Sequence, residues 1–88
     1  MFSGIVEEAA KVVRLEKEQE NLHITMHCSF TDELKIDQSI SHNGVCLTVV
    51  DITGDNYTVT AIKETLMKSN LGLLALGDKV NLERSTRL

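Results

Sequence analysis

The sequence contains no proline, only two cysteines and no excess of positive charge. The absence of proline and of low-complexity stretches predicts a chain without linkers or disordered tails. The formal net charge of −4 argues against a nucleic-acid partner, because a phosphate-binding module normally carries a basic excess. A chain of 88 residues can bury only a modest core, so we expect one domain spanning residues 1–88.

Long apolar runs are also missing. No segment approaches the roughly 20 residues that span a bilayer, and Met1–Gly4 lacks the basic start and apolar stretch of a signal peptide. We therefore expect a cytoplasmic protein without membrane contact, in which Cys28 and Cys46 are reduced thiols. His23 and His27 share one face of a predicted strand, but no third ligand accompanies them, so no metal site is expected.

The sequence does have apolar and polar residues that alternate with a period of two, which is typical of half-buried strands. This alternation predicts strands over residues 22–29, 45–50, 57–62 and 80–83. Residues 4–15 are less regular, but their valines and isoleucine favour extended structure. The alternative for part of this stretch is a helix over residues 7–11, where alanines and charges cluster.

Turn signals and short helices separate the predicted strands. Gly54–Asn56 predicts a hairpin turn. Asn43-Gly44 predicts either a turn or a bend within one long strand. Short helices are expected over residues 31–34 and 63–70, the second with Leu66 and Met67 facing inward.

About six strands in so short a chain have edges that must be protected, and closing the sheet into a barrel protects them. Mostly short connections favour antiparallel pairing. We therefore predict an all-β fold, a compact six-stranded antiparallel barrel with one or two short helices.

Five segments, in order, resemble the lumazine-binding repeat of the riboflavin synthase family. They are Met1–Glu7 (MFSGIVE), Ser39–Val49 (SISHNGVCLTV), Lys63–Leu66 (KETL), Ser69–Gly72 (SNLG) and Gly77–Arg84 (GDKVNLER). The resemblance covers essentially the whole sequence. It is to the N-terminal repeat, because the family's own N-terminus has a similar Phe-Ser-Gly-Ile-Val start.

The resemblance implies a Greek-key barrel that is one of two in tandem. The family enzyme converts two molecules of 6,7-dimethyl-8-ribityllumazine into riboflavin and 5-amino-6-ribitylamino-pyrimidinedione, with no metal or organic cofactor. It is a trimer in which an N-terminal barrel meets the C-terminal barrel of a neighbouring subunit. We therefore expect this half to bind lumazine or riboflavin, to need a second barrel for complete turnover, and to form a homodimer or higher oligomer.

The resemblance also implies three stretches of ligand-binding residues. They are Gly4, Ile5 and Val6; Cys46, Leu47 and Thr48; and Thr60, Ala61, Ile62, Lys63, Glu64 and Thr65. A glycine lets the backbone approach a flat ring, and a threonine hydroxyl can donate to or accept from a polyol or ring carbonyl. Ser39 and Cys46 would be the polar groups nearest the reacting side of the ring, and so the candidate catalytic residues.

Structural alternatives stand beside these assignments. Cys46 can be a small buried residue, as Cys28 is expected to be. His42 is expected to be a solvated turn residue, and Lys63 and Glu64 can be ordinary surface charges. Two other functions are compatible with the sequence: a non-catalytic lumazine or flavin carrier of the antenna type, and a barrel that makes only protein contacts.

Overall fold

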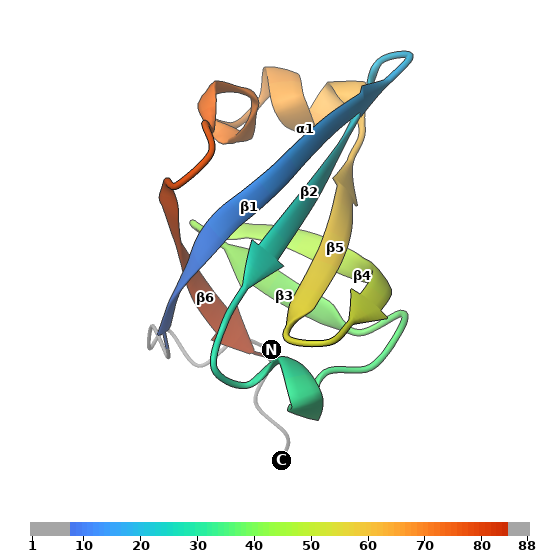
Figure 1. Cartoon of the computed structure of the whole chain (residues 1–88). Helices are drawn as coiled ribbons and strands as arrows, with labels where there is room; N and C mark the ends of the chain where they lie inside the picture. The colour runs from blue at the N-terminus through green and yellow to red at the C-terminus, as the bar shows by residue number, and fades with distance from the viewer. Residues whose placement is uncertain (1–7, 85–88) are drawn as a thin grey trace.

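The computed structural model describes residues 8–84, which form six strands and three short helices (Figure 1). The strands are β1 (Glu8–Glu18), β2 (Asn21–His27), β3 (Ser39–His42), β4 (Val45–Thr53), β5 (Asn56–Ala61) and β6 (Lys79–Arg84). The helices are η1 (Thr31–Glu33), α1 (Lys63–Met67) and η2 (Leu71–Leu73). The predicted all-β fold with short helices is confirmed.

The strands pair antiparallel in the order β1-β2-β5-β4-β3-β6, and β6 pairs with β1 to close the ring. Strands β3, β4 and β5 follow one another through tight turns. The chain then passes through α1 and η2 at one end of the barrel and returns as β6 beside β3 (Figure 1). This is the Greek-key connection, and ring closure gives every strand two hydrogen-bonded neighbours.

The interior is filled by the inward-facing residues of the alternating strands. Ile24 and Met26 on β2, Val49 on β4, and Tyr57 and Val59 on β5 are fully buried. Their outward-facing neighbours are polar or exposed, as the period of two predicts. The space inside the barrel is therefore a packed core.

His42 is part of this core, so its predicted solvation is wrong. It is fully buried, with Nδ1 2.9 Å from the carbonyl oxygen of Ile40 and Nε2 2.9 Å from the hydroxyl of Tyr57. Burial lowers the pKa of His42 to about 4, against a smaller opposing effect of the Ile40 carbonyl. The ring is therefore neutral at pH 7: Nδ1–H donates to Ile40, and Nε2 accepts from Tyr57.

The turns resolve the alternatives left by the sequence. Asn43 and Gly44, with φ of 50° and 87°, form a turn between separate strands β3 and β4, so the single bent strand is wrong. The hairpin at Gly54 is confirmed between β4 and β5. Residues 8–15 of the first stretch belong to β1, so the helix alternative is wrong for residues 8–11; residues 4–7 lie outside the described residues. Helix α1 ends at Met67, whose side chain is 75% exposed rather than inward.

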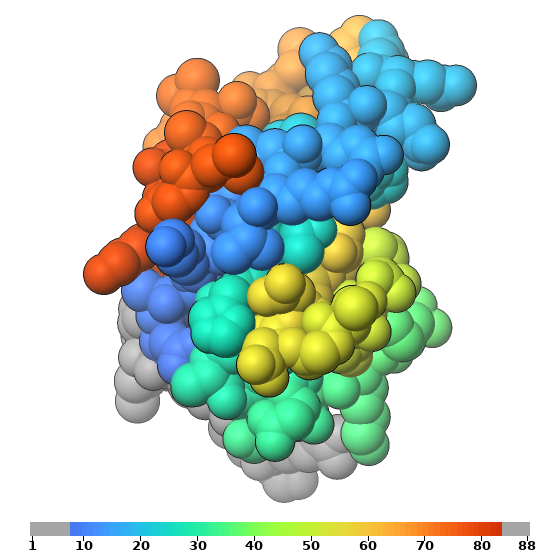
Figure 2. All heavy atoms as spheres, in the orientation of Figure 1, coloured from blue at the N-terminus to red at the C-terminus, as the bar shows by residue number. Residues whose placement is uncertain are grey.

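Two strands carry irregularities on one side of the barrel. The register shifts between Val12 and Arg14 in β1, and again between Val49 and Asp51 in β4. Bulges of this kind insert an extra residue and change where the neighbouring side chains point. Figure 2 views the barrel from the side of β1 and the β4–β5 hairpin.

No helix of the described residues is long and apolar enough to cross a membrane.

Candidate functional site

Four predicted site residues lie on the outer face of β3, β4 and β5. Ser39 pairs with Thr48 across β3 and β4. Val49 pairs with Val59, so Thr48 and Thr60, the next residues of these antiparallel strands, lie next to each other. Cys46 lies two residues before Thr48, on the same face of β4. We call Ser39, Cys46, Thr48 and Thr60 the outer strip.

The outer strip presents polar groups on a solvent-accessible surface. Ser39, Cys46 and Thr48 are exposed, and Thr60 is half-buried. Three hydroxyls and one thiol therefore face outward from three neighbouring strands. Each hydroxyl can donate one hydrogen bond and accept two, which suits a ligand with both donors and acceptors.

Leu47 lies between Cys46 and Thr48 on β4, and Ala61 follows Thr60 on β5. Both side chains face the inside of the barrel. Their side chains belong to the core, with exposures of 5% and 0%. Only the backbone of these two predicted site residues is left to border the outer face. In this position they support the strip by packing behind it.

The third predicted stretch continues from β5 into α1. Ile62, between the end of β5 and the start of α1, is 52% exposed. Lys63 lies 3.1 Å from Glu20, and Glu64 lies 2.8 Å from Lys68, so both charges are held in surface ion pairs. Thr65 is half-buried, and its backbone oxygen accepts from the hydroxyl of Ser69. The structure thus fits the alternative of Lys63 and Glu64 as surface charges.

The first predicted stretch, Gly4, Ile5 and Val6, lies outside the described residues.

The two cysteines differ in their surroundings. Cys28 is buried with its Sγ 3.3 Å from the hydroxyl of Thr31, which confirms its place in the core. Cys46 is exposed, so the alternative of a buried Cys46 is wrong.

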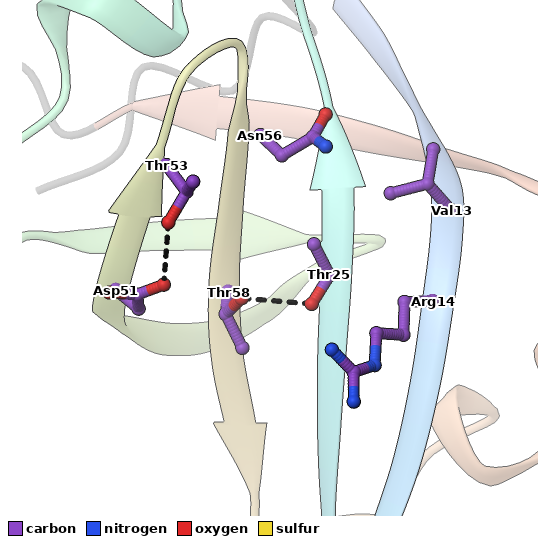
Figure 3. A pocket seen from close by; sticks show the side chains of 7 residues that line it. All are labelled: Val13, Arg14, Thr25, Asp51, Thr53, Asn56 and Thr58. Atoms are coloured by element: carbon purple, nitrogen blue, oxygen red, sulfur yellow. Dashed lines mark hydrogen bonds between the residues drawn. The ribbon is translucent and has the colours of Figure 1, made fainter.

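Among the described residues, two of the surface hollows lie apart from most of the predicted site residues. The larger, of about 390 Å³, is lined on β1, β2, β4 and β5 by Val13, Arg14, Thr25, Asp51, Thr53, Asn56 and Thr58. Figure 3 shows Thr25 and Thr58 in hydrogen-bond contact in the middle, with Arg14 and Asp51 on opposite sides. The smaller, of about 310 Å³, lies between the β1–β2 turn and α1, and Lys63 lines it.

Sequence reasoning missed the outward-facing residues of β2 that adjoin the outer strip. His23 pairs with Thr60 across β2 and β5, and its Nδ1 lies 2.8 Å from the Thr60 hydroxyl. The alternation does predict that His23 faces outward. It does not predict that β2 lies beside β5 rather than β3, because that pairing follows from the ring order.

Among residues 8–83, no three metal-ligating side chains gather at one place.

The closed ring and the outer strip define a small Greek-key barrel with a polar outer face on β3, β4 and β5. A family model described as the lumazine binding domain matches residues 3–85. The chain therefore belongs to the lumazine-binding domain family.

Riboflavin synthases are among its curated relatives. The chain is 42% identical over 89 residues to the riboflavin synthase of Escherichia coli (strain K12), covering 99% of this chain and 42% of that protein. It is 38% identical over 86 residues to that of Bacillus subtilis (strain 168), covering 97% of this chain and 40% of that protein. The chain thus spans less than half the length of these curated relatives.

Solved structures of similar fold include ligand complexes. The structure of LumP complexed with 6,7-dimethyl-8-(1'-D-ribityl) lumazine has a TM-score of 0.90 and 27% identity, covering 99% of this chain and 49% of that chain. The structure of LumP complexed with riboflavin also has a TM-score of 0.90 and 27% identity, covering 100% of this chain and 50% of that chain.

Proposed function

We propose that this chain is a lumazine-binding half of a riboflavin synthase. It binds 6,7-dimethyl-8-ribityllumazine or riboflavin and contributes to the dismutation of two lumazines into riboflavin and 5-amino-6-ribitylamino-pyrimidinedione. The observation that carries this proposal is 42% identity to a riboflavin synthase across 99% of the chain. The gathering of Ser39, Cys46, Thr48 and Thr60 on one face supports it.

In this proposal the ring lies flat against the outer strip. The interior of the barrel is filled, so the ligand uses the outside of β4 and β5. Thr48 and Thr60 hydrogen-bond to ring or ribityl groups, and Ile62 adds an apolar contact at the end of β5. The resemblance adds Gly4, Ile5 and Val6, which lie outside the described residues, as further ligand contacts, and Leu47 and Ala61 contribute backbone groups.

The chemistry demands little of the protein. The methyl group at C7 of the lumazine is acidic, because the ring delocalises the charge that remains after proton loss. The protein has to hold two rings in register and to assist proton movement. Ser39 and Cys46 are the proposed proton-handling groups, since both are exposed on the outer strip. The second ring is held by a second barrel of the family, and complete turnover requires it.

A fluorescence titration tests the binding part of this proposal. Riboflavin is titrated with the purified chain, and its emission is expected to be quenched at micromolar protein. Absence of quenching would contradict both lumazine and flavin binding. Turnover is then measured by following riboflavin formation from lumazine by the intact two-barrel protein, or by this half mixed with its partner half.

A non-catalytic carrier of lumazine or flavin is the second candidate. It is favoured by the likeness to LumP, whose solved structures are complexes with lumazine and riboflavin. A carrier would quench riboflavin emission in the same titration. It would form no riboflavin from lumazine, even when the barrels are paired, and this separates the two candidates.

We also propose that the chain assembles into a homodimer or higher oligomer. Apolar side chains are exposed in the connection from β5 to β6: Ile62 at 52%, Met67 at 75%, Leu73 at 82% and Leu76 at 67%. Exposed apolar surface of this kind tends to be covered by a protein partner. A second copy of the barrel is the proposed partner.

A further inference from the structure

The side chain of His23 connects a carboxylate to the outer strip. Its Nδ1 lies 2.8 Å from Oγ1 of Thr60 on β5, and its Nε2 lies 3.3 Å from Oε1 of Glu18 on β1. The His23 side chain is 28% exposed, while that of Glu18 is 69% exposed. Glu18, His23 and Thr60 thus form a continuous hydrogen-bonded chain that ends at the strip.

The carboxylate fixes the direction of these hydrogen bonds. An ionised carboxylate only accepts, so Nε2 of His23 carries the hydrogen that points at Glu18. A neutral imidazole has one N–H, which leaves Nδ1 with a lone pair. Nδ1 therefore accepts the hydroxyl hydrogen of Thr60, and the Thr60 oxygen keeps its lone pairs for a group on the outer face.

We propose that His23 is a positioning residue that makes the Thr60 hydroxyl an acceptor for a ligand donor, either the imide N–H of a pyrimidinedione ring or a hydroxyl of a polyol chain. This role rests on the proposed function, since it requires a lumazine or flavin on the outer strip. It adds a residue of β2, outside the three predicted stretches, to the groups that determine affinity.

The charged groups around His23 come from β1 and from the turn after it. Glu16 pairs with His23 across β1 and β2 and is itself 2.8 Å from Arg14. Glu18 contacts His23 directly. From β5 the outward-facing residues are Thr58 and Thr60, which carry no charge. Glu20, in the turn, is paired with Lys63. Of these charged side chains, that of Glu18 is the one that orients the His23 ring.

Binding measurements on the wild-type chain and three variants test the role. Riboflavin affinity is measured by fluorescence quenching for the wild-type chain, His23→Phe, Thr60→Val and the double variant. Each single change is expected to weaken binding about five-fold through one lost hydrogen bond. The double variant is expected to be no weaker than Thr60→Val, since both changes remove the same interaction. Equal, additive losses would overturn the role.

Rescue by a conservative variant separates positioning from a purely structural effect. His23→Gln keeps a side-chain acceptor for the Thr60 hydroxyl, so it is expected to recover most of the riboflavin affinity that His23→Phe loses. An affinity of His23→Gln as low as that of His23→Phe would contradict the role. His27→Gln is the control, because His27 is an exposed histidine on the same face of β2.

Two outcomes distinguish the failure of this role from the failure of the proposed function. If the wild-type chain binds riboflavin, and His23→Phe binds it equally well, only the role of His23 is overturned. If the folded wild-type chain binds neither riboflavin nor lumazine, the proposed function is overturned, and the role with it. Circular dichroism verifies that every variant is folded.

Discussion

Thr48 occupies the middle of the outer strip, with Ser39 opposite it on β3 and Thr60 next to it on β5. Thr48→Val removes the hydroxyl but keeps the shape of the side chain. We expect lumazine affinity to fall by about 1–2 kcal/mol, since a ligand group loses its hydrogen-bond partner. Fluorescence titration measures this. Thr53→Val, an exposed threonine further along β4, is the control, and an unchanged affinity for folded Thr48→Val would show that Thr48 is not a contact.

The two thiols offer a chemical test of the same surface. Cys46 is exposed and Cys28 is buried. In the native protein an aromatic disulfide reagent is expected to modify Cys46 rapidly and Cys28 only after unfolding. Saturating riboflavin should slow the modification of Cys46, because the proposed ring covers it. Modification at the same rate with and without riboflavin, under conditions where riboflavin emission is quenched, would place the ligand elsewhere.

His42 makes the stability of the barrel depend on pH. Its pKa is lowered from 6.5 to about 4 by burial in the folded state. Below pH 6.5 the unfolded chain takes up a proton that the folded chain does not bind until about pH 4. The stability contributed by neutral His42 is therefore complete above pH 6.5 and is lost as the pH falls towards 4.

Urea unfolding between pH 7 and pH 4 measures this dependence. The loss from His42 alone amounts to about 3 kcal/mol over the window. In His42→Gln, which can still accept from the Tyr57 hydroxyl, that part of the slope should vanish while the contribution of the carboxyl groups remains. Equal slopes for wild-type and variant would contradict a neutral, buried His42.

At the scale of the elements, the turn between β3 and β4 sets the register that brings Ser39 opposite Thr48. Asn43 and Gly44 both have positive φ, which a two-residue turn between antiparallel strands requires. Gly44→Ala is expected to destabilise the domain by about 1 kcal/mol, since an alanine is strained in that conformation. Gly72→Ala is the matched control.

The Gly72→Ala control separates the effect of backbone conformation on stability from the effect of steric crowding by the added Cβ. A Cβ at Gly44 would meet nothing within 4 Å, and one at Gly72 would meet Leu66 Cδ2 at 3.9 Å, an ordinary contact; of the two glycines, only Gly44 has positive φ. Chemical denaturation of both variants compares them. An equal loss of stability in both would show that the left-handed conformation of Gly44 is not the cause.

The strands could be predicted from the sequence because the alternation of apolar and polar residues is a local pattern. Ile24 and Met26 on β2 face inward as the period of two predicts, as do Tyr57 and Val59 on β5. The burial of His42 was missed because the neighbouring Asn-Gly pair favoured solvent, although His42 shares a strand face with buried Ile40. Its hydrogen-bond partner Tyr57, fifteen residues away on another strand, was not predictable from the local pattern.

The candidate site was predictable only in part for the same reason. The resemblance named Thr48 and Thr60, but their adjacency depends on the pairing of β4 with β5. The side chains of Leu47 and Ala61 turned out to face the core, since every second residue of a strand points inward. His23 was considered only as a metal ligand, because nothing local indicates that β2 and β5 are neighbours.

At the scale of the whole molecule, the apolar connection from β5 to β6 predicts association. We expect sedimentation velocity at high concentration to show a dimer or larger species. The double variant Leu73→Ser/Leu76→Ser should shift the distribution towards monomer, because the two exposed leucines contribute apolar area to the contact. Ile36→Ser, also an exposed apolar residue, is the control. A strictly monomeric wild-type chain would contradict this assembly.

The placement of Tyr57 has a practical consequence. The chain has one tyrosine and no tryptophan. That tyrosine is buried in the core of the barrel, where its hydroxyl contacts His42. Ultraviolet emission of the phenol therefore reports unfolding of the interior, while visible emission of a flavin reports occupancy of the exterior. The two optical signals arise from separate chromophores, so one cuvette can distinguish a variant that has lost its ligand from one that has lost its fold.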